Sequence, residues 1–132
     1  MTLGLCHPPG MMQRFKVGDV TITSVIEDET LHIPPEFFFP DAKAADVMRH
    51  PWPRPDYADE NGNIGLRVQA VVIEQAGRTI LVDPCVGNDK VRPMPFWNEM
   101  SWPFMECFAE AGLDAASIDM VVHTHLHADH VG

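Results

Sequence analysis

Three histidines and one aspartate lie within six consecutive positions, in the stretch HLHADH of residues 125–130. Imidazole nitrogens together with a carboxylate suit Zn²⁺, Mn²⁺, Fe²⁺ or Co²⁺. A single ion can hardly take all four donors from so short a segment. His125 and His127 can share one ion, and Asp129 and His130 can share a second ion beside it. Two ions with a bridging hydroxide would form a hydrolytic site.

A strand is needed to bring these donors together. The mostly apolar run IDMVVHT, residues 118–124, predicts a strand that is buried on both faces and ends just before His125. Side chains two positions apart on a strand point the same way, so His125 and His127 should project together from its tip. A turn would then bring Asp129 and His130 back beside them. The alternative is a polar surface loop, or a His-rich tract that binds metal adventitiously.

Alternating apolar residues predict three further strands upstream, at residues 20–26, 67–74 and 79–82. The last two would form a hairpin, with its turn at residues 75–78. Residues 31–63 hold many of the prolines, so they cannot form a long helix or a central strand. A long loop is expected there, and long loops in compact domains often serve binding.

One helix is expected between these strands and residues 123–132, which we call the metal-binding stretch. It would begin near Ser101 and stop at Gly112, with Met105, Phe108 and Ala109 as its buried stripe. Several strands, then a helix, then a buried strand indicate an α+β or layered α/β domain.

The chain of 132 residues has the length of one ordinary domain, with an irregular N-terminal tail expected at residues 1–14 and the domain at 15–132. A net charge of −10 repels phosphate and anionic lipid, so neither nucleic acid nor a membrane is an expected partner. No apolar run approaches the roughly 20 residues of a bilayer span. No secretory signal is recognisable, and three widely spaced cysteines form no disulfide framework. Together these features favour the reducing cytoplasm.

The metal-binding stretch also carries a resemblance to a known family. His-x-His-x-Asp-His after a strand reading VVHT, followed by Val-Gly, resembles the signature of the metallo-β-lactamase fold superfamily. TILVDPCVGNDK resembles the strand and loop before that signature, with Pro84 where a threonine is usual. FKVGDVTITSVIEDE resembles the first hairpin of the superfamily. The likeness runs from Phe15 onward and extends to bacterial metallo-hydrolases grouped with N-acyl-homoserine lactonases and methyl-parathion-type hydrolases.

The resemblance implies an αβ/βα sandwich with a dinuclear centre, expected to be two Zn²⁺, at one edge of its two sheets. It implies that His125 and His127 bind the first ion and that Asp129 and His130 bind the second. Asp129 is also implied as a catalytic proton shuttle. Asp83 matches an acidic residue that supports the metal-binding loop without touching the ions.

Members of the superfamily supply further ligands from positions beyond Gly132, namely a third histidine, a bridging aspartate and a last histidine. We therefore expect this chain to be the N-terminal half of the sandwich, a truncated form whose own competence depends on the other half. Its uncovered sheet face would invite self-association.

The implied function is metal-dependent hydrolysis, in which a bridging hydroxide attacks the ester or lactone carbonyl of a small-molecule substrate. Thioester, β-lactam and phosphoester hydrolysis are alternatives within the same fold. A non-catalytic fragment that binds metal or a partner is the alternative from a different class.

Other chemically notable residues have plainer interpretations. His123 is expected to be structural or to support the ligands, and Cys85 to be a buried thiol rather than a nucleophile. The acidic run Glu27-Asp28-Glu29 is expected to be a solvated strand end. Some aromatic residues either line an apolar substrate pocket or anchor their loops to the core, namely Phe37–Phe39, Phe96, Trp97 and Trp102.

Overall fold

The computed structural model describes residues 12–132, which divide into two compact units. The first unit comprises residues 12–27 and 68–132, and the second comprises residues 28–67. Most of the expected N-terminal tail, residues 1–11, lies outside the described residues. Strand β1 begins at Gln13, within the segment that was expected to be irregular.

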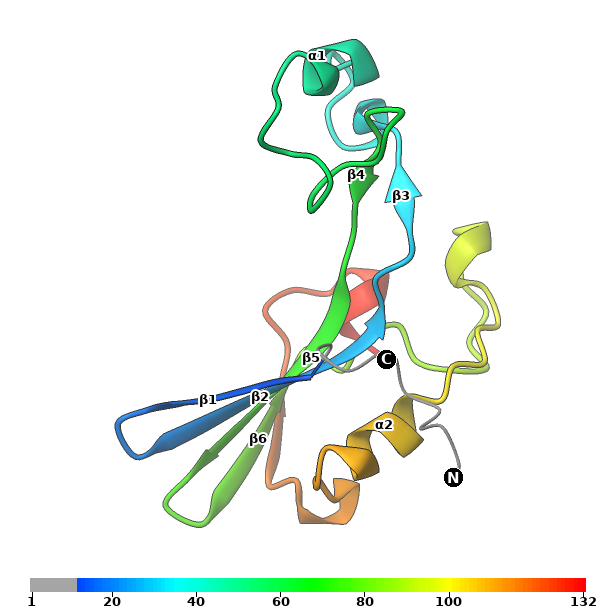
Figure 1. Ribbon diagram of the computed structural model, residues 1–132. Helices are drawn as coiled ribbons and strands as arrows, with labels where there is room; N and C mark the ends of the chain where they lie inside the picture. The colour runs from blue at the N-terminus through cyan, green and yellow to red at the C-terminus, as the bar shows by residue number, and fades with distance from the viewer. Residues whose placement is uncertain (1–11) are drawn as a thin grey trace, which may run out of the picture. The chain divides into compact units, whose positions relative to one another are not determined.

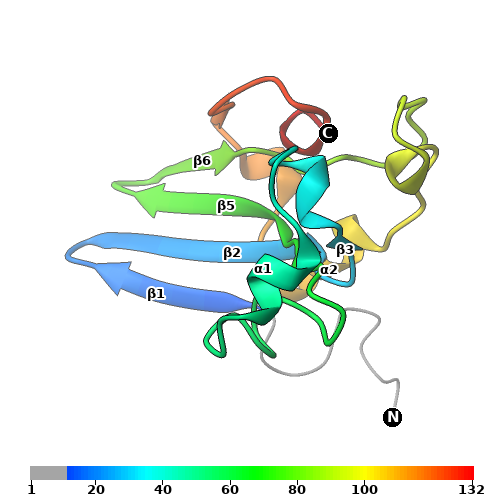
Figure 2. The ribbon, with the colours of Figure 1, turned by 90° about the horizontal axis from the view of Figure 1, so that it is seen from above.

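The first unit contains a five-stranded sheet with the strand order β1-β2-β5-β6-β7. The strands are β1 (Gln13–Val17), β2 (Val20–Asp28), β5 (Val68–Gln75), β6 (Arg78–Val82) and β7 (Met120–Val122). Figure 2 shows β1, β2, β5 and β6 side by side. The antiparallel pairing of β5 with β6 confirms the predicted hairpin. Its turn residues, Ala76 and Gly77, both have positive φ, which matches the twist of the flanking strands.

Strand β7 joins the sheet parallel to β6, with Leu81 paired to Val121. Parallel strands need a crossover connection, which here contains helix α2 (Phe104–Glu110) and the 3₁₀ turn η3 (Ala115–Ser117). All three side chains of β7 are exposed, so the prediction of a strand buried on both faces is wrong. The reason is topological: within the described chain β7 is the edge strand, paired to β6 alone.

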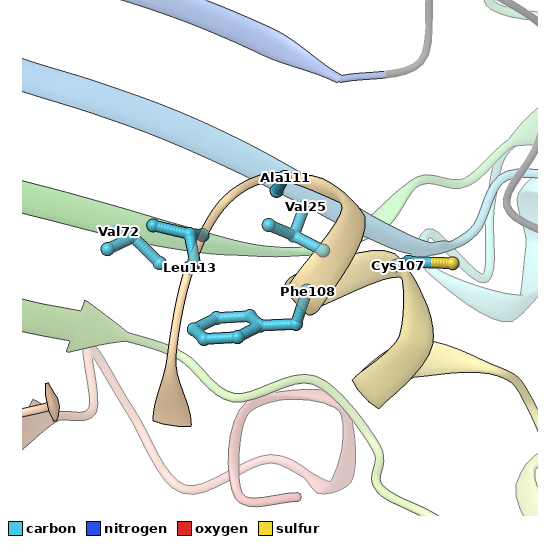
Figure 3. Close-up of a cluster of buried hydrophobic side chains, with 6 residues drawn as sticks. All are labelled: Val25, Val72, Cys107, Phe108, Ala111 and Leu113. Atoms are coloured by element: carbon cyan, nitrogen blue, oxygen red, sulfur yellow. The ribbon is translucent and has the colours of Figure 1, made fainter. Parts of the chain in front are cut away.

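The core of the first unit lies between α2 and one face of the sheet (Figures 1 and 3). Its buried members are Val25, Val72, Cys107, Phe108, Ala111 and Leu113. Phe104 packs against them and sets the phase of the helix, because a buried stripe recurs every three or four residues. The predicted stripe is therefore confirmed at Phe108 and wrong at Met105 and Ala109, which are exposed.

The centre of this core supplies a stability test. Val72 is 0% exposed, and Val72→Ala removes two methyl groups from a packed environment. We expect a loss of about 2 kcal/mol in the free energy of unfolding, from lost transfer energy and a residual cavity. Val17→Ala on the edge strand β1, where the valine is 60% exposed, is the matched control and should cost less than about 0.5 kcal/mol. Urea unfolding measures both, and equal losses would contradict the described core.

The second unit contains little regular structure, as its prolines predict. It consists of a two-stranded sheet, β3 (His32–Ile33) with β4 (Ile64–Gly65), the 3₁₀ turn η1 (Pro35–Phe37) and helix α1 (Ala44–Met48). Gly62 has φ of +81°, and a Cβ atom there would lie 2.6 Å from the carbonyl oxygen of Ala44. Only glycine therefore allows this close approach to α1.

The described α-helices are short, with five residues in α1 and seven in α2. None of them, in either unit, has both the length and the apolar character needed to cross a bilayer.

Candidate metal centre

The predicted metal-binding stretch starts where the parallel strands β6 and β7 end side by side. Val82 and Val122 are the last residues of the two strands and are paired in register. The backbone N–H of Asp83 donates to the carbonyl oxygen of Val122 at 2.9 Å, which continues the pairing by one step. Because the strands run parallel, the segments that follow them leave the sheet at the same edge. Asp83 is thereby brought beside the residues that follow β7.

Asp83 holds the beginning of the metal-binding stretch. Its Oδ1 accepts the backbone N–H of Thr124 at 2.8 Å, and its Oδ2 accepts the hydroxyl of Thr124 at 2.7 Å. Burial raises the pKa of this carboxyl group, but the hydrogen bonds from Thr124 and the close contact with the His130 ring outweigh burial and lower the pKa to about 2. Asp83 is therefore ionised at neutral pH. Its φ of 51° lies in the left-handed region, which few residues other than glycine adopt.

The first predicted ligand pair lies together. His125 Nε2 and His127 Nδ1 are 3.1 Å apart, while His125 Nδ1 is 3.0 Å from the hydroxyl oxygen of Thr124. Two nitrogens bound to one tetrahedral ion at about 2.0–2.1 Å would be about 3.3–3.4 Å apart. The observed spacing is close to that value, and it also suits a hydrogen bond from a protonated ring to its neighbour. The pair therefore fits a shared ion with little rearrangement.

The second predicted pair comes from the 3₁₀ turn η4 (Ala128–His130), which follows directly. His130 Nε2 lies 3.3 Å from Asp129 Oδ2, again close to the separation of two ligands on one ion. The other ring nitrogen of His130, Nδ1, lies 3.0 Å from Asp83 Oδ2. Nδ1 makes no well-directed hydrogen bond, so this contact is mainly electrostatic. Asp83 thus supports the ring of His130 from the side opposite Asp129.

The two pairs are adjacent but do not merge into one site. The ring centroids of His125 and His130 are 4.0 Å apart, so all four predicted donors gather in one place. Among residues 12–132, however, no three side chains of His, Cys, Asp or Glu are arranged to enclose a single ion.

His123 directly follows β7 and precedes the four predicted ligands. Its role differs from theirs. Its Nδ1 is 2.6 Å from the carbonyl oxygen of His130. A carbonyl oxygen can only accept, so His123 carries a proton on Nδ1 and donates it. His123 therefore supports the backbone of η4, as expected for a structural histidine.

Cys85 follows Asp83 by two residues and is fully buried. Burial raises the pKa of its thiol, and the negative charges of Glu27, Asp83 and Asp129 raise it further. The thiol is therefore protonated and unreactive, which confirms the interpretation of Cys85 as a structural residue.

The acidic run at the end of β2 was predicted wrongly. Glu27 and Asp28 are buried, with Glu27 only 2% exposed, rather than solvated. The alternation of the strand was a usable signal, because Glu27 is two positions from the core residue Val25 and so shares its face. The carboxylate of Glu27 accepts backbone N–H groups from Val86 and Gly87, in the loop that follows Asp83.

That loop packs closely against Gly132. The backbone N–H of Gly132 donates to the carbonyl oxygen of Cys85 at 2.8 Å. Gly87 has φ of +76°, and a Cβ atom at Gly87 would lie 2.8 Å from Cα of Gly132 and 2.9 Å from Cε of Lys90. Two glycines therefore allow the loop after β6 and the end of the metal-binding stretch to touch backbone to backbone.

This contact yields a prediction with an internal control. Gly77→Ala, at φ of +75° with open space around the new methyl group, should cost about 1 kcal/mol from backbone strain. Gly87→Ala meets the same strain plus the clash with Gly132, which should cost about 1–3 kcal/mol more. Urea unfolding of the two variants measures the difference. Equal losses would mean that the loop and Gly132 are not in contact in solution.

The aromatic residues divide between the two interpretations offered by the sequence. Trp97, in the 3₁₀ turn η2 (Pro95–Trp97), is buried, and the backbone of Trp102 exchanges two hydrogen bonds with the side chain of Asn88. The buried ring of Trp97 therefore anchors its loop, whereas Trp102 is held through its backbone. Phe37 and Phe39 in the second unit are exposed and remain candidates for contacts outside the core.

A known protein family matches the part of the chain that contains the candidate site. The model of the metallo-beta-lactamase superfamily matches residues 63–132, which are more than half of the chain. The matched region contains β5, β6, β7, α2, Asp83 and the whole metal-binding stretch. This protein belongs to the metallo-β-lactamase superfamily, as its resemblance implied.

Solved structures show the same fold. AidC, a dizinc quorum-quenching lactonase in complex with a product, is 18% identical with a TM-score of 0.67, over 92% of this chain and 38% of its own. The hydrolase AbOPH of the beta lactamase superfamily is 22% identical with a TM-score of 0.70, over 95% and 39%. A probable metal-dependent hydrolase from Staphylococcus aureus is 22% identical with a TM-score of 0.63, over 88% and 41%.

These comparisons support the predicted mixed α and β fold. The chain spans about two fifths of the length of the three solved structures. No curated protein matches it.

Proposed function

We propose that this chain carries part of the active site of a zinc-dependent hydrolase. The observation that supports this most directly is the pairing of donors at one sheet edge. His125 faces His127 at 3.1 Å, and Asp129 faces His130 at 3.3 Å, each close to the spacing of two ligands on one ion. Manganese, iron or cobalt suit the same donors.

The chain's own residues have separate tasks in this proposal. His125 and His127 would hold one ion, and Asp129 and His130 the other. These residues would hold zinc, which when bound would supply an activated water near neutral pH and a Lewis acid for the substrate carbonyl. Asp83 keeps the proton of His130 on Nδ1, facing its own carboxylate at 3.0 Å, and so leaves Nε2 available as a donor.

Asp129 is the proposed proton carrier. Its carboxylate has two oxygens, of which Oδ2 faces His130. The other oxygen can take the proton that the attacking water releases and hand it to the leaving alkoxide when an ester or lactone opens, since proton transfer by a positioned carboxyl group assists departure of such groups.

We propose the complete activity for a domain larger than the described residues. Catalytic zinc sites usually have three protein ligands and a water molecule, whereas each donor pair here supplies two. The solved relatives are more than twice as long as the aligned part of this chain. Further residues would therefore complete the coordination of each ion and cover the open sheet face.

The proposed substrate is a small ester or lactone. The likeness to a lactonase supports it, and the net charge of −10 disfavours a nucleic acid. Thioesters, β-lactams and phosphoesters are the alternatives within the same fold.

A second candidate is a metal-binding or interaction module without activity. It is favoured by one observation, namely that no three donors among residues 12–132 enclose an ion. The two candidates differ in turnover rather than in metal content.

The test is to measure zinc per chain by elemental analysis and then hydrolysis of a lactone, a chromogenic ester, a thioester, a β-lactam and a phosphoester, before and after chelation. In the larger domain proposed above, we expect bound zinc and chelator-sensitive hydrolysis that is highest for the lactone or the ester. Bound zinc without any turnover would favour the module. Absence of bound zinc would contradict the metal centre itself.

A further inference from the structure

Glu27 is a buried carboxylate in a chain that is already strongly acidic. It lies on β2, on the face of the sheet that packs against α2, and is 2% exposed. Burying a charge is costly unless the charge is paired or hydrogen-bonded. A buried carboxylate therefore has a strong compensating interaction.

The carboxylate of Glu27 binds two successive peptide N–H groups. Its Oε2 accepts from Val86 at 2.8 Å, and its Oε1 accepts from Gly87 at 3.1 Å. Hydrogen bonds to an ionised acceptor are about twice as strong as neutral ones. The carbonyl group of Val86 is bound as well, by Nη2 of Arg92 at 2.9 Å. The peptide units around Val86 are thus held from both sides.

The segment held by Glu27 touches the metal-binding stretch at both of its ends. Asp83 begins the segment and binds Thr124, which precedes the first ligand. Cys85 accepts from the N–H of Gly132, which follows η4, and Gly87 packs against Gly132. A shift of the 83–87 segment would therefore move the frame that carries all four donors.

Building on the function proposed above, we propose that Glu27 is a positioning residue of the metal centre. It fixes the Val86 and Gly87 peptides, and through Gly132 it fixes the η4 turn that carries Asp129 and His130. It does not bind the ions.

The negative charge of Glu27 is also expected to favour metal binding. Burial raises the pKa of the Cys85 thiol, and the charges of Glu27, Asp83 and Asp129 each raise it further, so all three carboxylates act on the same place. A buried negative charge near a cation site favours cation binding. Replacement of Glu27 should therefore weaken metal binding through both geometry and charge.

Glu27→Gln is the informative change because it keeps the size of the side chain. An amide has one acceptor oxygen, so its NH₂ group would face one of the two peptide N–H groups. Glu74→Gln is the matched control, since it also removes one negative charge from the same sheet. Glu74 pairs with Arg14 at 2.8 Å on the exposed part of the sheet and does not touch the 83–87 segment.

The first measurement is amide hydrogen exchange of the metal-free chain. Glu27→Gln should speed exchange at Val86, Gly87 and Gly132 by about tenfold or more, while the β5–β6 ladder stays within about twofold of the wild type. Glu74→Gln should change none of these three amides. Unchanged exchange at Gly132 in Glu27→Gln would overturn the proposal.

The second measurement is zinc affinity, by competition with a chromophoric chelator. Glu27→Gln should weaken binding by roughly tenfold or more, as loss of residues that support metal ligands does, and Glu74→Gln by less than about twofold. Equal affinities of the two variants would overturn the positioning role while leaving the proposed function intact. A wild-type chain that binds no zinc would instead overturn the proposed function, and the positioning role with it.

Glu27→Gln could also speed amide exchange throughout the β5–β6 ladder, which would indicate general unfolding. A second variant is then measured. Glu27→Asp keeps the charge but is one methylene shorter, so it can retain the fold while loosening the contact. Faster exchange at Gly132 with weaker zinc binding would support the proposal, and wild-type values for both would overturn it.

Discussion

His127→Ala is expected to lower the affinity for zinc by more than about 100-fold, because loss of a direct ligand should exceed the 10- to 100-fold effect of losing a supporting residue. His127 presents Nδ1 to His125 Nε2 at 3.1 Å, and a lone imidazole cannot replace the pair. Any metal-dependent hydrolysis should disappear with it. Zinc competition and lactone hydrolysis measure the two effects.

The matched control is His50→Ala. His50 is exposed in the second unit, and its substitution removes the same side chain without touching the sheet edge. Its zinc affinity should stay within about twofold of the wild type. Equal losses for the two variants would show that the histidines bind zinc adventitiously.

Asp83→Asn is expected to have the second largest effect, through the ring of His130. The carboxylate of Asp83 accepts two hydrogen bonds from Thr124 and faces His130 Nδ1 at 3.0 Å. An asparagine that keeps its oxygen toward the N–H of Thr124 places its NH₂ group near His130. His130 Nδ1 must then become the acceptor, so the proton moves to Nε2, the atom that faces Asp129.

Two losses follow from the substitution of Asp83. Zinc binding at the Asp129–His130 pair should weaken by roughly 10- to 100-fold, because Nε2 no longer offers a lone pair. The free energy of unfolding should fall by about 1–3 kcal/mol, since hydrogen bonds to a charged group are lost. Nitrogen-15 NMR of the metal-free chain should detect the change of tautomer at His130, and chemical denaturation should detect the loss of stability.

Asp89→Asn provides the control for this pair of effects. Asp89 lies in the same loop and also has positive φ, 57° against 51° at Asp83, so both substitutions alter charge and backbone preference alike. Asp89→Asn should leave the tautomer of His130 and zinc binding unchanged. An unaltered tautomer in Asp83→Asn would refute the proposed role of Asp83.

The local parts of this protein were predictable because short-range chemistry determines them. Alternation of β-branched residues predicted the β5–β6 hairpin, and the structure confirms it. The i, i+2 spacing of His125 and His127 after an apolar run predicted that their rings would lie together, and they do.

Burial was predicted less well, because it depends on what covers each face. Residues 118–124 looked like a strand buried on both sides, yet β7 is an exposed edge strand in the described chain. Glu27 looked solvated, yet it is buried against the peptides of a loop about 60 residues away in sequence. Composition alone does not distinguish a charge at a wet strand end from one that binds backbone N–H groups.

The sequence by itself determined the donor set, the spacing of the donors and the strand that precedes them. Only the tertiary structure decided that Asp83 binds Thr124 and His130 and that Glu27 binds the loop after Asp83. These contacts exist because β6 and β7 lie parallel and in register, across the connection that contains α2. Parallel pairing is a long-range result of packing α2 on the sheet, and no local pattern of residues encodes it.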